Sequence, residues 1–193
     1  WGAGGGCGAG SVGGGAGVDG APARSAGLGQ GGEADDPRVD VGSVGLGVVV
    51  RADAAVPDIS SADTFQKSLV QAQSLVFNRA STGVYLESLL RKRGIYEQLQ
   101  AKSTRYPDGA AVMEHVLHGK GREIGFGAIT EILLYRDKGL KLVGPLPAEI
   151  QNYTAYSATA MAGAANRDLV TQFLGYLGSP AGKSLFRDAG IEP

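Results

Sequence analysis

The pattern of hydrophobic and polar positions divides the chain into two unlike parts. Up to about Glu33 the residues are mainly glycine, alanine and other small residues, with neither the two-residue period of a strand nor the helical period of about 3.6 residues. From Val44 onward, short β-branched runs alternate with stretches in which apolar residues recur every three or four positions. The second part is therefore expected to fold, whereas the first cannot bury enough apolar surface to offset its backbone entropy.

The second part predicts an open α/β sheet with helices on both faces, because strands and helices alternate with short connections. Strands are expected at residues 44–50, 74–77, 103–106, 123–126 and 140–143, with an extended segment at 152–160. Helices are expected after a cap at Ser60 or Ser61, after Ala80 as far as Gly94, at 95–101, from Pro107 to Gly119, at 128–134, and after caps at Asn166 and Ser179. Sheets of this kind bind ligands beyond the carboxyl ends of their strands.

Composition narrows the class of protein further. The chain has 193 residues, which suffices for one or two compact domains, and its net charge of -1 offers no broad basic field for nucleic acid. No apolar run approaches the roughly 20 residues of a spanning helix. A single cysteine, Cys7, excludes an internal disulfide and a four-thiolate zinc site. We therefore expect no nucleic-acid partner, and the sequence shows no metal site or cofactor motif.

The segment 77–83 is the most informative motif, since it places two hydroxyl groups where a strand leads into a helix. Unpaired N–H groups and a partial positive charge at the first helical turn favour an anion, with Ser81 and Thr82 as further donors. Gly83 would allow close approach to the backbone, and Arg79 could add a charged contact. The alternative is ordinary N-capping by Ser81 or Thr82.

Residues 124–130 form a second strand-to-helix corner, in which two glycines bracket the turn. The alternative there is close packing of the helix on the strand.

Residues 178–184 resemble a phosphate-binding loop but have three residues instead of four between the glycines, so we interpret them as a capped helix. Glu114 and His118 are four residues apart on one helix, yet without an apparent third ligand they predict a solvated face. No catalytic acid–base pair is evident.

Several segments, in this order and spacing, resemble bacterial extracellular solute-binding proteins of the molybdate-binding type. They are residues 38–52, 56–60, 74–94, 109–126, 142–151 and 179–193. The resemblance covers about Arg38 to Pro193 and implies a type 2 periplasmic-binding fold, in which two α/β lobes joined by crossover strands close on a ligand. It implies a second lobe that is clear and a first lobe that is incomplete or atypical, because a glycine-rich segment precedes Val39.

Mapped onto this chain, the resemblance divides it into four parts: an atypical glycine-rich segment or first-lobe remnant at 1–37, a crossover strand and linker at 38–60, the second lobe at 61–151, and a hinge strand with closing helices of the first lobe at 152–193. It implies that Ser81, Thr82 and Gly83 hold the ligand from the second lobe. Gly127 and Ala128 would lie beside them, and Tyr153 would approach from the hinge.

The resulting hypothesis is a non-enzymatic periplasmic protein that captures a small anion, a molybdate-like oxyanion or a related solute, for the permease of an ABC transporter. No signal peptide opens the sequence, so a periplasmic location requires a leader that was removed or lies outside it. One alternative is a small serine hydrolase or transferase that uses Ser81 or Ser157. Another is a non-transport ligand-binding, structural or oligomeric remnant, including a homodimer.

Overall fold

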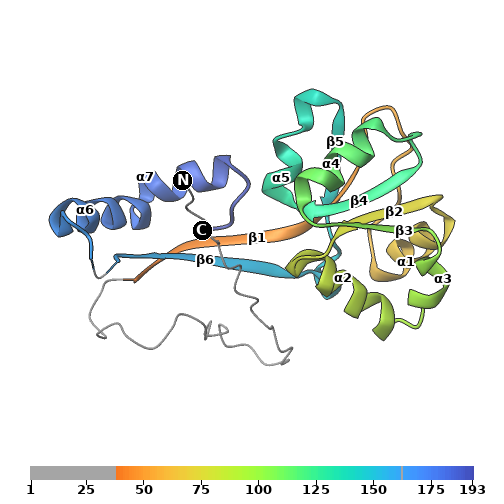
Figure 1. Cartoon of the computed structure of the whole chain (residues 1–193), viewed down its shortest axis with the longest axis horizontal. Coiled ribbons are helices and arrows are strands. Elements are labelled where there is room, and N and C mark those ends of the chain that lie inside the picture. The colour runs from red at the N-terminus through yellow and green to blue at the C-terminus, as the bar shows by residue number, and fades with distance from the viewer. Residues whose placement is uncertain (1–37, 162) are drawn as a thin grey trace, which may run out of the picture. The chain divides into compact units, whose positions relative to one another are not determined.

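The computed structural model describes residues 38–161 and 163–193 (Figure 1). The expectation for residues 1–37, and with it Cys7, lies outside the described residues. In the described ranges the strand and helix order predicted from the sequence is confirmed, and the fold is a mixed α/β fold. No helix in these ranges is long and apolar enough to cross a membrane.

The strands form a mixed sheet with the order β3-β2-β4-β1-β5, and β6 pairs with β1 beyond this path. Their bounds are β1 (Arg38–Arg51), β2 (Ser74–Asn78), β3 (Ser103–Tyr106), β4 (Glu123–Ala128), β5 (Leu140–Pro145) and β6 (Tyr153–Thr159). Strand β2 is parallel to β3 and β4, whereas β1 is antiparallel to β4, β5 and β6. The carboxyl ends of β2 and β4 therefore lie at the same edge, and both lead into helices.

The helices begin and end close to the predicted positions. They are α1 (Ala62–Gln71), α2 (Ser81–Lys92), α3 (Tyr96–Gln100), α4 (Gly109–His118), α5 (Ile129–Leu133), α6 (Arg167–Gly178) and α7 (Pro180–Asp188), with short 3-10 turns η1 (Arg136–Lys138) and η2 (Ala148–Ile150). The expected caps are confirmed: the side chains of Ser61, Asn166 and Ser179 each accept a backbone N–H in the first turn of α1, α6 and α7. Residues 178–184 are thus a capped helix start.

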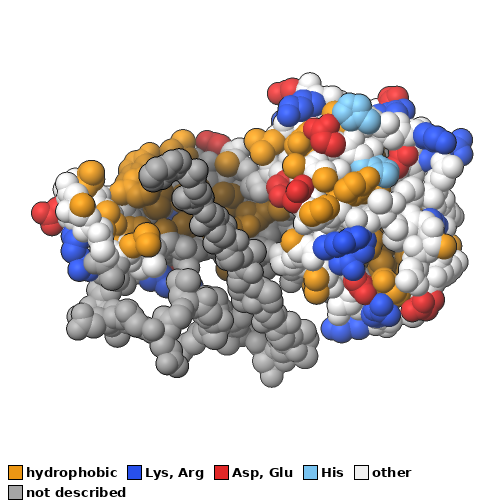
Figure 2. All heavy atoms as spheres, viewed as in Figure 1, with side chains coloured by type: hydrophobic (Ala, Val, Ile, Leu, Met, Phe, Trp, Pro, Cys, Tyr) orange, Lys and Arg blue, Asp and Glu red, His pale blue; other side chains and the backbone are white. Residues whose placement is uncertain are grey.

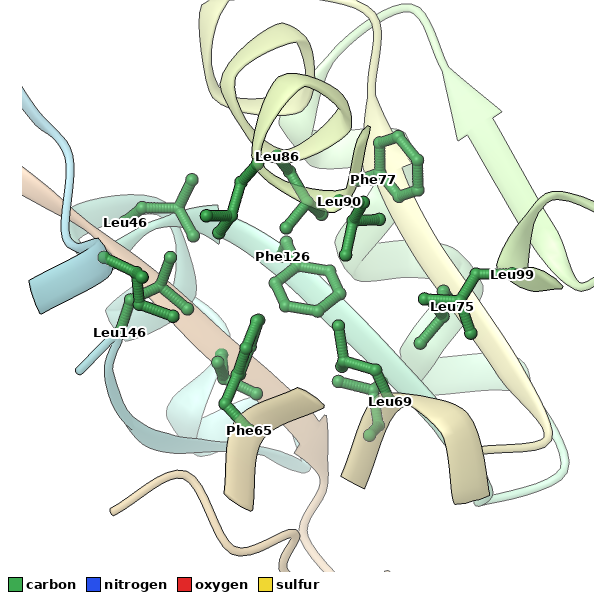
Figure 3. Packing of buried hydrophobic residues seen from close by; sticks show 14 of the residues in the cluster. Leu46, Phe65, Leu69, Leu75, Phe77, Leu86, Leu90, Leu99, Phe126 and Leu146 are labelled. Atoms are coloured by element: carbon green, nitrogen blue, oxygen red, sulfur yellow. The ribbon is translucent and has the colours of Figure 1, made fainter. Parts of the chain in front are cut away.

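The core lies on both faces of the sheet, because successive strand residues point to opposite sides. Val48 and Val50 of β1 join a cluster beneath α1, α2 and α3, whereas Val49 joins a second cluster beneath α4 and α5. Phe126 of β4 lies at the centre of the first cluster, with its ring 6.1 Å from that of Phe65 in an edge-to-face arrangement (Figure 3). The two packed faces hold the strand ends in place.

Strand β1 is longer than the predicted strand at 44–50, and its two halves have different partners. Residues 46–51 pair with β4 or β5, and residues 38–45 pair with β6. The chain end returns to this second half, where the Ser43 N–H donates to the Glu192 carbonyl oxygen (2.6 Å) and the Glu192 N–H to the Ser43 oxygen (2.8 Å). The β1–β6 pair therefore connects the packed sheet with the C-terminal helices.

The apolar face predicted for α6 forms on a helix but is largely exposed. Leu174 is buried at 4% exposure, whereas Leu169 and Phe173 on the same helix are 60% and 58% exposed. Figure 2 shows hydrophobic side chains gathered over α6 and α7. In the described ranges, α6 packs on β1 and α7 along one side, and no described layer covers the rest of this face.

Candidate functional site

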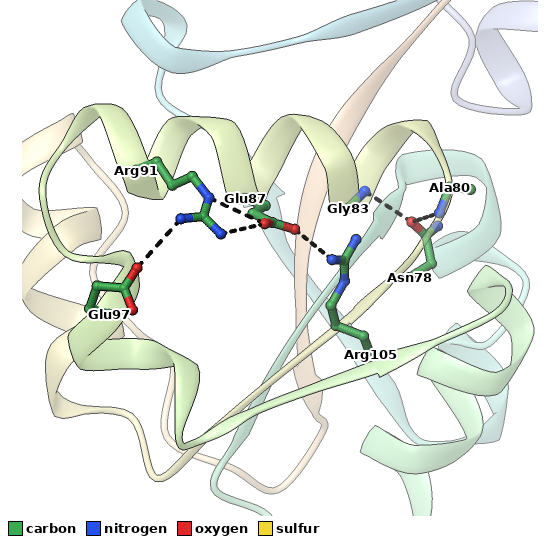
Figure 4. Close-up of polar contacts among 7 residues, drawn as sticks. All are labelled: Asn78, Ala80, Gly83, Glu87, Arg91, Glu97 and Arg105. Atoms are coloured by element: carbon green, nitrogen blue, oxygen red, sulfur yellow. Dashed lines mark hydrogen bonds and ion pairs between the residues drawn. The ribbon is translucent and has the colours of Figure 1, made fainter. Parts of the chain in front are cut away.

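The corner between β2 and α2 is organised by the side chain of Asn78. This residue is 5% exposed, and its Oδ1 accepts the N–H groups of Ala80 (3.1 Å) and Gly83 (2.9 Å) (Figure 4). A Cβ on Gly83 would overlap the carbonyl oxygen of Asn78, so the absence of a side chain at Gly83 permits this tight corner. Two of the N–H groups at the start of α2 are thus satisfied from the strand.

The capping alternative for Ser81 and Thr82 is wrong. The N-cap of α2 is Ala80, and no side chain caps the helix at that position. Because Asn78 satisfies the N–H of Gly83, the hydroxyl groups of Ser81 and Thr82 are not used for capping. The first turn of α2 also contains no acidic residue, which preserves the partial positive charge of the helix start.

A small hollow lies where the start of α2 meets the two halves of β1. Its lining contains hydroxyl and amide groups but no carboxylate, imidazole or amine: Val44, Gly45, Leu46, Thr82, Ala128, Asn152 and Thr154. Its volume is about 10 Å³, which is about enough for one water molecule. The hollow is bounded by the start of α2, the end of β4 and the β1–β6 crossover.

The sequence-predicted residues lie at different depths around this hollow. Thr82 and Ala128 line it directly. Ser81 and Arg79 are exposed beside it in the β2–α2 corner. Tyr153 is 49% exposed, and its Cε1 atom lies 3.3 Å from where a Cβ of Gly45 would be.

Two predicted residues have packing roles in this structure. Gly83 is buried against Asn78. Gly127 is also buried, and a Cβ at that position would lie 2.8 Å from Cε of Met113. The structure therefore brings together Thr82 and Ala128, with Arg79, Ser81 and Tyr153 nearby. The ligand-binding role of all seven residues stays a prediction.

Sequence reasoning missed several lining groups, namely Gly45, Asn152 and Thr154. Their positions on the crossover strands were expected, but individual residues there carry no local motif. The sequence signal that could have found them was the expected hinge, in which residues 38–60 and 152–160 were expected to run close to each other.

Charged groups farther along α2 form a separate network. Glu87 pairs with Arg91 (2.9 Å) and with Arg105 of β3 (2.5 Å), as Figure 4 shows. The hydrogen bond from Arg91, together with the charges of both arginines, holds the pKa of Glu87 below its ordinary value despite partial burial. This carboxylate stays ionised and paired along the helix, more than one turn beyond Thr82.

The histidines of α4 are engaged elsewhere. His115 Nδ1 lies 2.8 Å from the hydroxyl of Tyr106, and His118 Nδ1 lies 3.0 Å from the carbonyl oxygen of Glu114. In the described ranges no group of three or more His, Cys, Asp or Glu side chains could hold a metal ion. A larger apolar hollow of about 410 Å³ lies between β6 and α6, but its lining offers few polar groups to orient an anion.

Solved structures identify the fold of the chain. The chain matches the substrate-binding domain of a molybdenum ABC transporter from Clostridium difficile with a TM-score of 0.65 and 19% identity, over 80% of this chain and 66% of that one. It matches the periplasmic molybdate-binding protein of Azotobacter vinelandii with a TM-score of 0.61 and 17% identity, over 81% and 68% of the two chains. The fold is that of type 2 periplasmic binding proteins.

The sequence itself assigns the family. Residues 19–192 match the family model for bacterial extracellular solute-binding proteins, and the chain belongs to this family. Among curated proteins it is 29% identical over 160 residues to an aconitate isomerase from Pseudomonas, which covers 83% of this chain. The chain spans 60% of the length of that relative.

Proposed function

We propose that this chain contributes the ligand-holding second lobe and hinge of a capture protein for a small anion. The observation that carries the proposal is the wall formed by Thr82, Ala128 and Asn152, which combines a helix start, a hydroxyl and an amide and has no carboxylate in its lining. Such neutral donors and helix termini bind anions without a metal. Membership of the solute-binding family supports capture as the function.

The proposed ligand class is a small oxyanion or carboxylate. Molybdate-like anions are favoured by the names of two structures that share the fold, and an organic acid is favoured by the name of the isomerase relative. Ser81 and Thr82 would contact the anion from the start of α2 and Arg79 from the β2–α2 corner, with Gly83, Gly127 and Ala128 beside them. Tyr153 would contact it from the hinge.

We assign residues 38–60 to a crossover strand and linker, 61–151 to the second lobe, and 152–193 to the hinge strand and closing helices of a first lobe. The exposed apolar face of α6 supports this division, because helices of water-soluble domains bury such a face against another layer. Closure of the two lobes about the β1–β6 hinge would enclose the anion, and the closed state would be recognised by an ABC-type permease. The family supports a periplasmic or extracellular location for this step.

The proposal is tested by isothermal titration of the folded chain with molybdate, tungstate, sulfate, phosphate, cis-aconitate and trans-aconitate. We expect one-to-one binding of at least one of them. Replacing Ser81 or Thr82 by Ala should weaken that binding about tenfold or more, because a hydrogen bond to a charged group contributes about 1.5–3 kcal/mol. Ser88→Ala, an exposed change on the same helix, is the matched control and should leave affinity unchanged.

Arg79→Ala should weaken binding if its guanidinium reaches the anion, and unchanged affinity would remove Arg79 from the site. A folded chain that binds none of the six anions would contradict capture of a small anion by the described residues.

A second candidate is catalysis on an unsaturated organic acid, favoured by the similarity to a protein named aconitate isomerase. Proton spectra of cis-aconitate and trans-aconitate incubated with the chain would reveal it as interconversion of the two. The lining of the hollow offers no acid–base side chain, which is why capture is the first proposal. Hydrolysis through Ser81 or Ser157 has less support, since the described hydrogen bonds of His115 and His118 go to Tyr106 and Glu114.

A further inference from the structure

One edge of β1 is shared by two strands that meet at Leu46. Strand β5 pairs with residues 47–51 and β6 with residues 38–45. The Leu46 carbonyl oxygen accepts the N–H of Leu146 (3.1 Å), and the Leu46 N–H donates to the carbonyl oxygen of Asn152 (3.1 Å). Because the N–H and C=O of one residue in an antiparallel ladder point to the same edge, residues 147–151 loop out between the two strands. The edge of β1 is therefore interrupted at Leu46.

The side chain of Gln151 bridges this interruption. Its Nε2 donates to the Leu46 carbonyl oxygen (3.0 Å), and its Oε1 accepts the N–H groups of Leu46 (3.1 Å) and Asn152 (2.8 Å). A carboxamide carries the same donor and acceptor as a peptide group. Gln151 thus gives the N–H and the carbonyl oxygen of Leu46 a second partner each, beside their backbone bonds to Asn152 and Leu146, at a residue that is 3% exposed.

The same segment contacts both sides of the hollow. A Cβ at Gly45 would lie 3.2 Å from Gln151 Nε2, so the carboxamide rests directly against the lining residue Gly45. From α2, the hydroxyl of Tyr85 donates to the carbonyl oxygen of Ile150 (2.9 Å). Residues 150–152 therefore connect the helix that carries Thr82 with the crossover wall that carries Gly45 and Asn152.

We infer that Gln151 is a positioning residue for the anion site, an inference that rests on the proposed function. It holds Gly45 and Asn152 at a fixed distance from Thr82 by joining β5 and β6 on the edge of β1. Without its hydrogen bonds, the β1–β6 hinge would spread at Leu46, and the two walls would contact the anion less well. Gln151 acts through the backbone and need not touch the ligand.

The experiment compares the chain with Gln151→Met, which keeps the side-chain length but removes the three hydrogen bonds. The probe is the tightest-binding member of the six-anion panel, titrated well below the unfolding midpoint of each variant. We expect the Kd of Gln151→Met to rise about tenfold. Gln98→Ala, an exposed glutamine change on α3, is the control and should leave the Kd unchanged.

A double-mutant cycle with Thr82→Ala separates positioning from a general structural role. If Gln151 acts by placing the wall opposite Thr82, its substitution should cost less affinity once Thr82 is already Ala. Amide hydrogen exchange should also accelerate at Leu46 and Asn152 in Gln151→Met, with the amides of α4 unaffected. Additive effects on Kd would overturn the positioning role.

A Kd for Gln151→Met within twofold of the unsubstituted chain would also overturn the inference, with the proposed function left intact. If Gln151→Met does not fold, Tyr85→Phe is tested in its place, because it removes only the hydroxyl link to Ile150. We expect the Kd of Tyr85→Phe to rise about threefold. An unchanged Kd would overturn the inference. An unsubstituted chain that binds no member of the panel would remove the proposed function and this inference together.

Discussion

The packed sheet and the β6–α6–α7 region differ in what their apolar side chains contact. In the packed sheet, Phe65, Phe77 and Phe126 are at most 1% exposed, because helices cover both faces. On α6, Leu169 and Phe173 are more than half exposed although their spacing is equally amphipathic. The difference shows that an amphipathic pattern suffices to predict a helix, whereas burial of its apolar face requires a facing layer.

The physical reason lies in the number of layers available to each region. A core needs two packed layers, and β1 with β4 and β5 lies between helices on both sides. A two-stranded ribbon such as the β1–β6 pair has marginal stability by itself. In the described ranges, the contacts of α6 are made mainly with β1 and α7. The β6–α6–α7 region is thus held in place by its contacts with β1 rather than by a hydrophobic core of its own.

The largest expected effect comes from a matched pair of phenylalanine substitutions. Phe126→Ala should lower the free energy of unfolding by about 3–5 kcal/mol, because it leaves a cavity in the packed core. Phe173→Ala on α6 should change it by less than about 0.5 kcal/mol. Urea denaturation measures the free energy of unfolding of both variants. If Phe126→Ala does not fold, Phe126→Leu is measured in its place. Equal losses would mean that the face of α6 is covered in solution.

The next effect concerns a buried carboxylate of the packed sheet. Glu123 is 8% exposed and accepts the N–H groups of residues 120–122 at 2.7–2.9 Å. Burial by itself raises the pKa of Glu123, but these donors outweigh it and hold the pKa below its ordinary value of 4.5. Glu123 therefore stabilises the fold above that value, and this contribution is lost as the pH falls through the lowered pKa.

Glu123→Gln should accordingly lower the free energy of unfolding at neutral pH by about 1–3 kcal/mol, because the charged acceptor of three N–H groups is lost. It should also make unfolding less sensitive to acid. Urea midpoints measured from about pH 3 to pH 7 give both quantities. Glu97→Gln, at a side chain that is 79% exposed, is the control. An acid limb identical to that of the unsubstituted chain would contradict the role of Glu123.

Helix caps give a smaller effect that sharpens the comparison. Ser61→Ala removes the cap of α1, whose Phe65 and Leu69 lie in the core, and should lower global stability by about 1 kcal/mol. Asn166→Ala removes the cap of α6 and should lower global stability by less than about 0.5 kcal/mol while hydrogen exchange in α6 accelerates. A global loss as large as that of Ser61→Ala would show that α6 unfolds together with the packed sheet.

The smallest effect on stability is expected at the exposed apolar face itself. Leu169→Gln should change the free energy of unfolding by less than about 0.5 kcal/mol but reduce the fluorescence of a dye that binds apolar surface. Leu134→Gln, at a leucine that is 74% exposed at the C-terminal end of α5, is the control. Equal dye binding by both variants would show that the apolar side chains of α6 do not act as one surface.

Local sequence signals predicted most of the fold. The β-branched run at residues 44–50, the cap at Ser61 and the cap with proline at Ser179 each depend on neighbouring residues, so their structures were foreseeable. The extension of β1 back to Arg38 was expected only from the family resemblance, as part of a crossover strand and linker at 38–60. The local pattern did not predict it, because its glycine-containing residues are extended by pairing with β6. Strand propensity predicts little where a segment is extended because it pairs with a distant strand.

The candidate site was predicted in part for the same reason. Thr82 was found because a hydroxyl at a strand-to-helix corner is a local motif, whereas Asn152 lines the hollow through pairings between residues far apart in the chain. The hydrogen bond from the Gly83 N–H to Asn78 was also missed, since Ser81 and Thr82 are good caps by residue type. Which side chain accepts this N–H depends on how β2 leads into α2.

The sequence by itself determined the order of strands and helices, most of the caps and the family of this protein, because these depend on spacing and residue type along the chain. The tertiary structure decided that β5 and β6 meet at Leu46 and that Gln151 bridges them. It also decided that Thr82 and Asn152 line the same hollow and that the apolar face of α6 stays exposed. These features depend on which distant segments lie side by side, and hydrogen bonds and burial between such segments have no signature in local periodicity.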